Sequence, residues 1–467
     1  MNMGRRKKIF GVALFSAIIG CCLLCAVNLK ARDHRSDRII LIVADALRAD
    51  HVGCYGAPGN PTPHIDALAA RGWRFTDALA PGSETVTSNR ALFTGLHPYR
   101  ARGSRRWDLH AGVPTIATCL SDAGFRTAGF SAQRIISKQF GYDQGFESFT
   151  CLSRRDDRIT TLAIDWISRH RRDRYFLLIY LLDPHGPYDP TCIGDRERRA
   201  AMSGPSDWTP VISWRDPQTG KRIISAFVAP LPPDARTERV KVTLLHALYR
   251  NEVRMADARV GRLMQAIGDD NRATIIFLAD HGEEWAEHGG LWHERTLFRE
   301  VLHVPFIVSR AGIAPRVVHA PVTQMDIAPT IFAFAGIAPP PGLDGRSLGD
   351  PDAIPTRTLF AEKPDGARRG IHDCAAYTPN EAILRCSARD IAGRHSATPP
   401  SWVRYDLATD PNQQHPVPVG KSDVCYKEVA AYYAKLCSSQ KQLPSSPPLP
   451  LSPEVRDELR ALGYIAK

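Results

Sequence analysis

The chain has 467 residues, and 60 Lys and Arg against 49 Asp and Glu give it a formal net charge of +11. Hydrophobic residues make up 43% of the sequence and charged residues 23%, which excludes a disordered or fibrous protein. Residues 9–27 are the one apolar run of nearly bilayer-spanning length, so a protein with several membrane spans is excluded as well. We expect one large globular unit, or two to three smaller domains, after residue 30.

The N-terminus has the pattern of an export signal. The first eight residues contain four basic residues and no acidic one: Arg5, Arg6, Lys7 and Lys8. The apolar run follows directly. A basic segment before an apolar one keeps the charged end in the cytoplasm and sends the rest of the chain across the membrane. We expect an uncleaved signal anchor, with a lipoprotein attached through Cys21 or a cleaved secreted protein as alternatives. The sequence therefore predicts a membrane-anchored, extracytoplasmic protein, in the periplasm or at the cell surface.

Eight of the eleven cysteines follow this segment. In an oxidising compartment, Cys374 with Cys386 and Cys425 with Cys437 are spaced to close local disulfides. Buried free thiols are the alternative reading for the other four: Cys54, Cys119, Cys151 and Cys192. The spacing of Cys and His residues indicates no structural zinc site.

Three short apolar runs each end at an aspartate. Residues 38–44 end at Asp45, residues 175–182 at Asp183, and residues 274–279 at Asp280. Runs of this kind are typical of buried parallel strands. Helical patterns lie between them, at 64–71, 113–123 and 243–267. Strands that alternate with helices predict an α/β sheet, in which ligands bind at the carboxyl ends of the strands.

The pattern changes beyond about residue 350. Residues 375–393 and 401–407 predict short strands with turns, and therefore a smaller α+β subdomain. A final helix follows a Pro/Ser-rich linker, with Ser452 as its N-cap and Pro453 at its first position. The expected divisions are 1–30 (signal anchor or signal peptide), 36–350 (main α/β domain), 351–442 (C-terminal subdomain) and 443–467 (linker and terminal helix).

Four segments carry residues with catalytic or metal-binding chemistry: 43–56, 85–95, 181–190 and 278–294. Asp280 and His281 place a carboxylate oxygen next to an imidazole nitrogen directly after a strand, and this combination suits zinc or manganese. His288 and His293 follow within the same segment. We expect these two histidines to bind a second metal ion or an anionic substrate.

From about residue 38 to residue 464, the chain resembles the sulfatase-like branch of the alkaline phosphatase superfamily. The resemblance is carried by ADALRADHVGCYG, TPHIDALAARGWRFTDALA, ALFTGLHP, DPHGPY, ADHGEEWAEHGG, DIAPTIFAFAGI and GLDGRSL, in the family's order. It implies a mostly parallel central sheet flanked by helices, with the smaller C-terminal subdomain packed on this catalytic domain. It also implies that Asp45 and the pair Asp280–His281 bind a divalent metal ion.

The family signature places the nucleophile ten positions before a glycine, and counting back from Gly95 gives Thr85. The signature has Cys or Ser at that position, and its Pro and Arg are replaced here by Thr87 and Asn89. Typical members oxidise the Cys or Ser to formylglycine. Threonine should not undergo this conversion, so formylglycine is not expected. The second Asp after the first strand is also missing, because Ala46 occupies its place.

The set that remains is similar to that of superfamily members in which a metal-activated threonine attacks phosphate esters or transfers phosphoryl-linked groups between lipid head groups. Its expected metal ligands are Asp45, Thr85, Asp280 and His281. We expect zinc or manganese, with calcium as the alternative. Thr85, His185 and His293 are the expected catalytic residues, and Ser88, Asn89 and His288 are expected to contact the substrate.

The sequence thus predicts a metal-dependent hydrolase of sulfate or phosphate esters. Its expected substrate is an anionic ester of a small molecule, glycan or lipid, in keeping with a diffuse positive charge. The alternatives are an envelope phosphoryl-group transferase and a catalytically weak binding protein on the same fold. Nucleic-acid binding is disfavoured, because no basic run with interleaved aromatic residues follows the N-terminal segment. Residues 191–239 are a predicted specificity insert.

Overall fold

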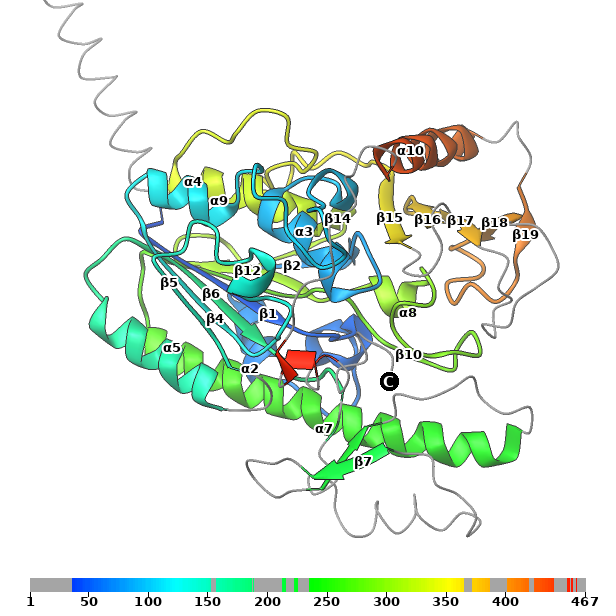
Figure 1. Cartoon of the computed structure of the whole chain (residues 1–467), viewed down its shortest axis with the longest axis horizontal. Coiled ribbons are helices and arrows are strands. Elements are labelled where there is room, and N and C mark those ends of the chain that lie inside the picture. The colour runs from blue at the N-terminus through cyan, green and yellow to red at the C-terminus, as the bar shows by residue number, and fades with distance from the viewer. Residues whose placement is uncertain are drawn as a thin grey trace, which may run out of the picture.

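An eight-stranded sheet forms the centre of the molecule, with helices on both faces (Figure 1). The computed structural model describes residues 36–152, 157–186, 188, 212–215, 222–225, 235–364, 372–386, 401–419, 424–440, 452, 453, 455, 456 and 459. A separate five-stranded antiparallel sheet forms a smaller subdomain toward the C-terminus. The predicted α/β class, with a mostly parallel central sheet and a C-terminal α+β subdomain, is confirmed.

The central sheet has the strand order β13-β2-β12-β9-β1-β6-β4-β5. The five strands from β9 to β5 are parallel, whereas β12 runs antiparallel to both of its neighbours. The strand bounds are β1 Arg38–Ala44, β2 Trp73–Phe75, β4 Arg126–Ser131, β5 Ser148–Cys151, β6 Tyr175–Leu181, β9 Ala273–Ala279, β12 Phe306–Arg310 and β13 Arg316–Val318.

The register of the three middle strands positions the candidate site. β1, β6 and β9 are buried over their whole length, which agrees with their largely apolar sequences. Ala44 of β1 lies opposite Leu181 of β6 and Ala279 of β9. Asp45 and Asp280 are the next residues of their strands, so both leave the sheet at the same edge. The three predicted strands that end near an aspartate are confirmed.

Helices cover the two faces of this sheet. Figure 1 shows α2, α5 and α7 on one side of it and α3, α4 and α9 on the other. Their bounds are α2 Pro63–Ala70, α3 Thr85–Thr94, α4 Ile116–Asp122, α5 Arg158–Arg169, α7 Ala235–Ile267 and α9 Ile327–Ala335. The helix predicted from residue 113 starts later, because the Thr115 side chain accepts a hydrogen bond from the Thr118 amide and caps it.

The C-terminal subdomain is built on its antiparallel sheet and one long helix. Its elements are β15 Leu359–Pro364, β16 His372–Tyr377, β17 Glu381–Cys386, β18 Ser401–Asp406, β19 Val417–Pro418 and α10 Val424–Gln440. The Tyr377 hydroxyl donates to the Leu297 carbonyl and so joins this sheet to the main domain. We propose a domain boundary near residue 350, between the end of α9 and the start of β15. Within the final segment, the Ser452 hydroxyl accepts from the Val455 amide, as an N-cap does.

Short elements complete the described chain. The two-residue strands are β3 Ala78–Leu79, β10 Glu284–Trp285, β11 Leu291–Trp292 and β14 Val322–Thr323, and a hairpin is formed by β7 Ile212–Arg215 and β8 Arg222–Ser225. The short helices are η1 Ala49–His51, η2 Gly53–Tyr55, η3 Pro98–Arg100, η4 Lys138–Phe140, α8 Arg299–Leu302 and η6 Gln324–Asp326. The hairpin and the first turn of α7 are the described parts of the predicted specificity insert, residues 191–239.

The two proposed disulfides are absent, because Cys374 and Cys437 are both free thiols. Each is one partner of a predicted pair, so neither local bridge forms. Cys54, Cys119 and Cys151 are free as well, which agrees with the alternative reading for these three.

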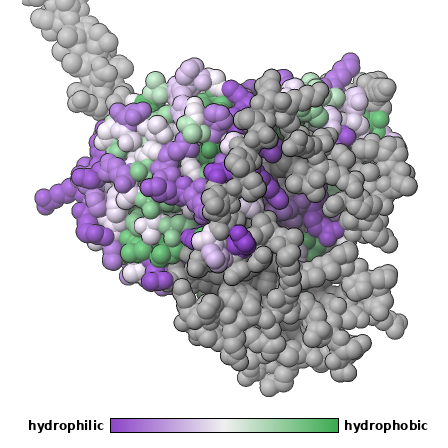
Figure 2. All heavy atoms as spheres, in the orientation of Figure 1, coloured by the Kyte–Doolittle hydropathy of each residue, from purple (hydrophilic) through white to green (hydrophobic). Residues whose placement is uncertain are grey.

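The predicted localisation needs correction. Within the part of the chain that the structure describes, no helix combines the length and the apolar composition needed to cross a bilayer. This finding contradicts the prediction of a membrane-anchored, extracytoplasmic protein. The apolar run at residues 9–27 lies outside the described residues. Figure 2 shows hydrophilic and hydrophobic residues interspersed over the described surface on one face.

Candidate active site

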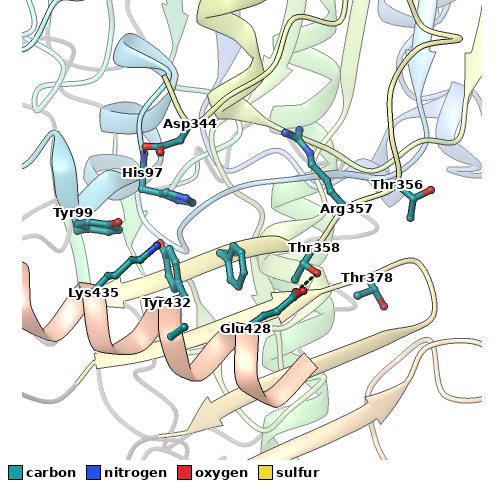
Figure 3. Close-up of a pocket in the computed structure, with 12 residues that line it drawn as sticks. His97, Tyr99, Asp344, Thr356, Arg357, Thr358, Thr378, Glu428, Tyr432 and Lys435 are labelled. Atoms are coloured by element: carbon teal, nitrogen blue, oxygen red, sulfur yellow. Dashed lines mark hydrogen bonds between the residues drawn. The ribbon is translucent and has the colours of Figure 1, made fainter. Parts of the chain in front are cut away.

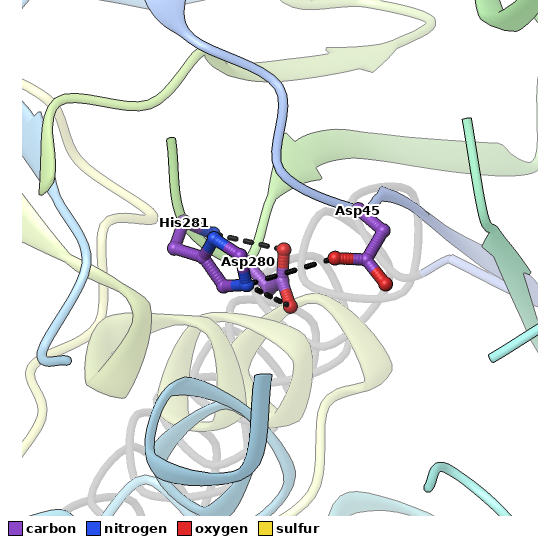
Figure 4. Close-up of side chains that lie close together, drawn as sticks. All are labelled: Asp45, Asp280 and His281. Atoms are coloured by element: carbon purple, nitrogen blue, oxygen red, sulfur yellow. Dashed lines mark hydrogen bonds and ion pairs between the residues drawn. The ribbon is translucent and has the colours of Figure 1, made fainter. Parts of the chain in front are cut away.

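Three buried side chains meet at the carboxyl edge of β1 and β9. Asp45, Asp280 and His281 each offer a ligand atom, and these atoms lie within 4.8 Å of one another (Figure 4). Nε2 of His281 lies 3.6 Å from Oδ1 of Asp45 and 3.5 Å from Oδ2 of Asp280. All three side chains are fully shielded from solvent.

The surroundings of Asp280 stabilise its carboxylate. Oδ1 accepts from the amides of Ala46 (3.1 Å) and His281 (2.9 Å), and Oδ2 accepts from the Tyr180 hydroxyl at 2.6 Å. Ala46 has a φ of 59°, an uncommon conformation for a residue with a side chain. Its carbonyl accepts from the Tyr249 hydroxyl, which helps to hold this turn after β1.

The imidazole of His281 is oriented by its own loop. Nδ1 lies 2.9 Å from the Gly282 carbonyl oxygen and donates to it, which leaves Nε2 to face the two carboxylates. Burial lowers the pKa of His281, so the neutral ring that can bind a metal ion is favoured.

Asp45 is less well satisfied than Asp280. Its Oδ2 accepts from the Gln133 side chain at 2.5 Å, but its Oδ1 has no hydrogen-bond partner among the described residues. Burial raises the pKa of Asp45, and the nearby Asp280 raises it further. The cluster thus offers two buried carboxylates and an imidazole nitrogen, and one carboxylate oxygen has no hydrogen-bond partner among the described residues. This set of groups fits a divalent cation.

Thr85 opens α3 beside this cluster, and its Oγ1 lies 3.3 Å from Nε2 of His281. The helix contains β-branched residues and is buried at all ten positions, so packing rather than intrinsic propensity holds it in place. It ends at Gly95, whose φ of 71° is the left-handed conformation of a helix C-cap. The amides at the start of α3 also favour an anion near Thr85.

Two further residues of α3 have distinct roles. Nδ2 of Asn89 donates to the Tyr180 hydroxyl oxygen at 2.9 Å and lies 3.3 Å from Oδ2 of Asp280. Asn89 thus belongs to the cluster, at the position of the signature Arg. The Ser88 hydroxyl instead donates to the Gly82 carbonyl at 2.9 Å, which supports the turn before α3. We therefore do not include Ser88 among the proposed substrate contacts.

Two further histidine rings lie close to His281, tilted relative to one another. The ring centroids of His281 and His293 lie 4.3 Å apart, and those of His293 and His185 lie 4.9 Å apart. Nδ1 of His293 is 3.0 Å from Oε1 of Glu283, and Nδ1 of His185 is 2.5 Å from the Gly186 carbonyl oxygen. Burial raises the pKa of Glu283 to about 8 and lowers that of His293. The structure thus brings both predicted acid or anion-binding histidines to the cluster.

His288 has other partners. Its Nδ1 lies 2.7 Å from Oε1 of Glu300, its Nε2 lies 2.9 Å from the Gln413 carbonyl oxygen, and its ring stacks on Phe298. Both ring nitrogens are therefore occupied, and the bond from Nε2 joins the main domain to the loop after β18. We leave His288 out of the proposed substrate contacts.

The sequence model of the sulfatase family matches residues 37–337, which include this whole cluster. The chain belongs to the sulfatase family. It is a sulfatase-like hydrolase, and members of this family bind a divalent metal ion. The match also agrees with the resemblance inferred from the sequence blocks.

Curated sulfatases match most of the length of this sulfatase-family chain. Human arylsulfatase A is 26% identical over 449 residues, which cover 82% of this chain and 83% of the human protein. The ulvan-active sulfatase of Formosa agariphila is 23% identical, over 89% of this chain and 84% of that protein. A solved structure, the phosphonate monoester hydrolase of Agrobacterium radiobacter, shares the fold with a TM-score of 0.64 and 20% identity, covering 88% of this chain and 96% of that one.

Three residues of this sulfatase-family site were not predicted from the sequence. Tyr180 lies inside an apolar strand run, where its polar hydroxyl is the single available signal. Gln133 follows β4 and contacts Asp45 from a segment without any recognised motif. Glu283 is part of the HGEE segment, but its bond to His293 depends on how the loop folds back.

Proposed function

We propose that this hydrolase is metal-dependent and uses Thr85 as the nucleophile on a sulfate or phosphate ester. The observation that carries the proposal is the position of Thr85 Oγ1, 3.3 Å from Nε2 of His281 and at the start of a buried helix. A hydroxyl next to a cluster of metal-binding groups is suited to nucleophilic attack. Because a threonine stands at the nucleophile position, no formylglycine is required.

The proposed ligands of the ion are Asp45, Asp280 and His281, with Thr85 Oγ1 beside them. An imidazole together with carboxylates favours zinc or manganese, with calcium as the alternative. A bound ion would lower the pKa of the threonine hydroxyl and neutralise charge that develops on the transferred group.

The roles of the protein groups follow from their positions. Thr85 gives up its hydroxyl proton to solvent, and Oγ1 forms a bond to sulfur or phosphorus while the bond to the leaving oxygen breaks. Water then hydrolyses the threonine ester, which releases sulfate or phosphate and restores the hydroxyl. We assign proton transfer to the leaving oxygen, and contact with the anionic group, to His293 and His185. Glu283 fixes the His293 ring through its bond to Nδ1. The Asn89 side chain holds the start of α3 by donating to the Thr85 carbonyl at 2.8 Å.

Sulfated or phosphorylated sugars are the substrate class that we favour. The Formosa agariphila relative is an ulvan-active sulfatase. Thr85, however, stands where typical sulfatases have Cys or Ser, so phosphate esters belong to the same proposal.

Turnover of matched chromogenic esters tests this proposal. We expect the purified protein to hydrolyse p-nitrophenyl phosphate or p-nitrophenyl sulfate when loaded with zinc or manganese, and to lose the activity on chelation with EDTA. Restoration by the added metal, but not by magnesium alone, is the expected control. Full activity in protein shown to be metal-free by elemental analysis would contradict the proposal.

Replacing Tyr180 with phenylalanine tests how the proposed ligand Asp280 is held. Burial raises the pKa of Tyr180 well above its usual value, so its hydroxyl stays protonated and donates to Asp280. Loss of such a supporting bond weakens metal affinity about tenfold to a hundredfold. Tyr175→Phe, on the same strand, is the matched control and should bind zinc like the wild type in a chelator-competition titration. Equal zinc affinity in both variants would show that Tyr180 does not support the ligand.

A further inference from the structure

A pocket lies between the main domain and the C-terminal subdomain. It has a volume of about 700 Å³, within the range of small-molecule sites. Residues from the segment after α3, from the start of β15 and from α10 line it (Figure 3). We call it the α10 pocket.

The α10 pocket is separate from the cluster around Thr85. Thr85 begins α3, whereas His97 follows the end of that helix and lines the pocket. At 1.5 Å per residue, the ten-residue helix holds its two ends about 15 Å apart. A ligand in this pocket therefore does not occupy the catalytic site.

Aromatic rings form one part of the wall. His97 and Tyr99 are stacked with their ring centroids 5.7 Å apart, and Phe360 and Tyr432 are stacked at 4.6 Å. His97, Tyr99 and Phe360 are half-buried and therefore still offer ring surface. Flat apolar faces of this kind accept the C–H face of a sugar ring.

Polar groups between the rings are left for a ligand. Among the residues that the structure describes, Nδ1 of His97 is buried without a hydrogen-bond partner, and Lys435 takes part in no ion pair. The other cation of the wall, Arg357, pairs with Asp326. Figure 3 shows the Lys435 side chain directed toward His97 and Tyr99. One ammonium group is thus available beside the aromatic wall.

The remaining wall is suited to hydroxyl groups. The carboxylate of Glu428 accepts from Thr358 through one oxygen, and Asp344 is paired with Arg100. Thr356 and Thr378 add hydroxyls at the other end of the pocket in Figure 3. Carboxylates among the lining groups disfavour a ligand with several negative charges, whereas a polyol with one acidic group satisfies both the acceptors and Lys435.

We propose that the α10 pocket binds a sugar unit that carries one acidic substituent. Its ring packs on the His97, Tyr99 and Phe360 faces, and its acidic group pairs with Lys435. This site goes beyond the reaction at Thr85 and does not depend on it.

Calorimetric titration with an unsulfated chondroitin disaccharide, which contains one glucuronate and no ester for the enzyme to cleave, tests the proposal. We expect saturable binding that is at least about tenfold tighter than binding of neutral N-acetyllactosamine. Lys435→Gln should weaken acidic disaccharide binding about tenfold. Lys427→Gln, an exposed change on the same helix but outside the pocket, should leave the affinity unchanged.

Two further measurements separate this site from the catalytic one. Lys435→Gln should leave turnover of a small chromogenic ester unchanged, and Thr85→Ala should still bind the acidic disaccharide with wild-type affinity. Equal affinity for the neutral and acidic disaccharides, no saturable binding at millimolar concentration, or loss of binding in Thr85→Ala would each overturn the proposal.

Discussion

Thr85→Ala should lower kcat for ester hydrolysis by at least about a thousandfold, because it removes the attacking oxygen while leaving the neighbouring groups in place. Thr85 Oγ1 is the hydroxyl that lies 3.3 Å from His281 Nε2. The change suits the helix, since alanine is the best helix former. Steady-state kinetics with a chromogenic phosphate and sulfate ester give the measurement.

The controls for this variant come from the same helix. Thr85→Ser keeps a hydroxyl and should retain at least about a tenth of the activity. Thr94→Ala removes a buried hydroxyl that donates to the Arg90 carbonyl at the far end of α3, and it should leave kcat close to the wild-type value. Activity of Thr85→Ala comparable to that of Thr94→Ala would exclude Thr85 as the nucleophile.

Asp45→Asn is expected to have opposite effects on stability without and with metal. Asp45 is a fully buried carboxylate that lies near Asp280, and one of its oxygens has no hydrogen-bond partner among the described residues. Asparagine keeps an oxygen for Gln133 but removes the negative charge. The metal-free variant should therefore be about 1–3 kcal/mol more stable than the metal-free wild type at neutral pH.

The stability of the metal-free protein should also depend on pH through Asp45. Because the pKa of Asp45 is raised in the folded state, the metal-free wild type holds this proton more tightly than the unfolded chain does. Its stability should fall as the pH rises above about 3.9, the ordinary pKa of an aspartate. The Asp45→Asn substitution removes this contribution, so the difference between the two proteins should shrink in acid.

Added zinc or manganese should reverse the order. At a hundred times its Kd, an ion that binds the folded state alone adds about 2.7 kcal/mol to the wild type, and it should add much less to Asp45→Asn. Urea unfolding with EDTA and with metal measures all four states. Equal metal stabilisation of the two proteins would remove Asp45 from the proposed ligands.

Much of the fold was predictable because buried parallel strands have mostly apolar sequences. β1 and β9 are mostly apolar and end directly before Asp45 and Asp280, so the edge where they meet follows from parallel pairing. The start of α7 was placed too late, at residue 243 rather than Ala235, since helix ends carry weaker signals than helix centres.

The direction in which a side chain points cannot be predicted from sequence spacing, and this limits the prediction of the site. His288 and His293 stand five residues apart in one loop, but the His288 ring is bound by Glu300 and Gln413, whereas the His293 ring lies next to His281. Sequence spacing does not distinguish these two outcomes. The contact of Tyr180 with Asp280 joins positions a hundred residues apart, and it depends on the register of both β6 and β9 against β1, which lies between them.

The cysteine spacing was misleading for a related reason. Cys374 lies on β16 and is fully buried, and it remains a free thiol. A disulfide needs both a close approach and aligned side chains, and neither follows from separation along the chain.

Rapid quenching followed by mass spectrometry of the peptide that contains Thr85 tests the central claim most directly. With metal-loaded enzyme in turnover, we predict a phosphoryl or sulfuryl group covalently attached to Thr85 Oγ1, and no such adduct in Thr85→Ala. An unmodified Thr85 in quenched enzyme that accumulates an adduct at another residue would contradict the account.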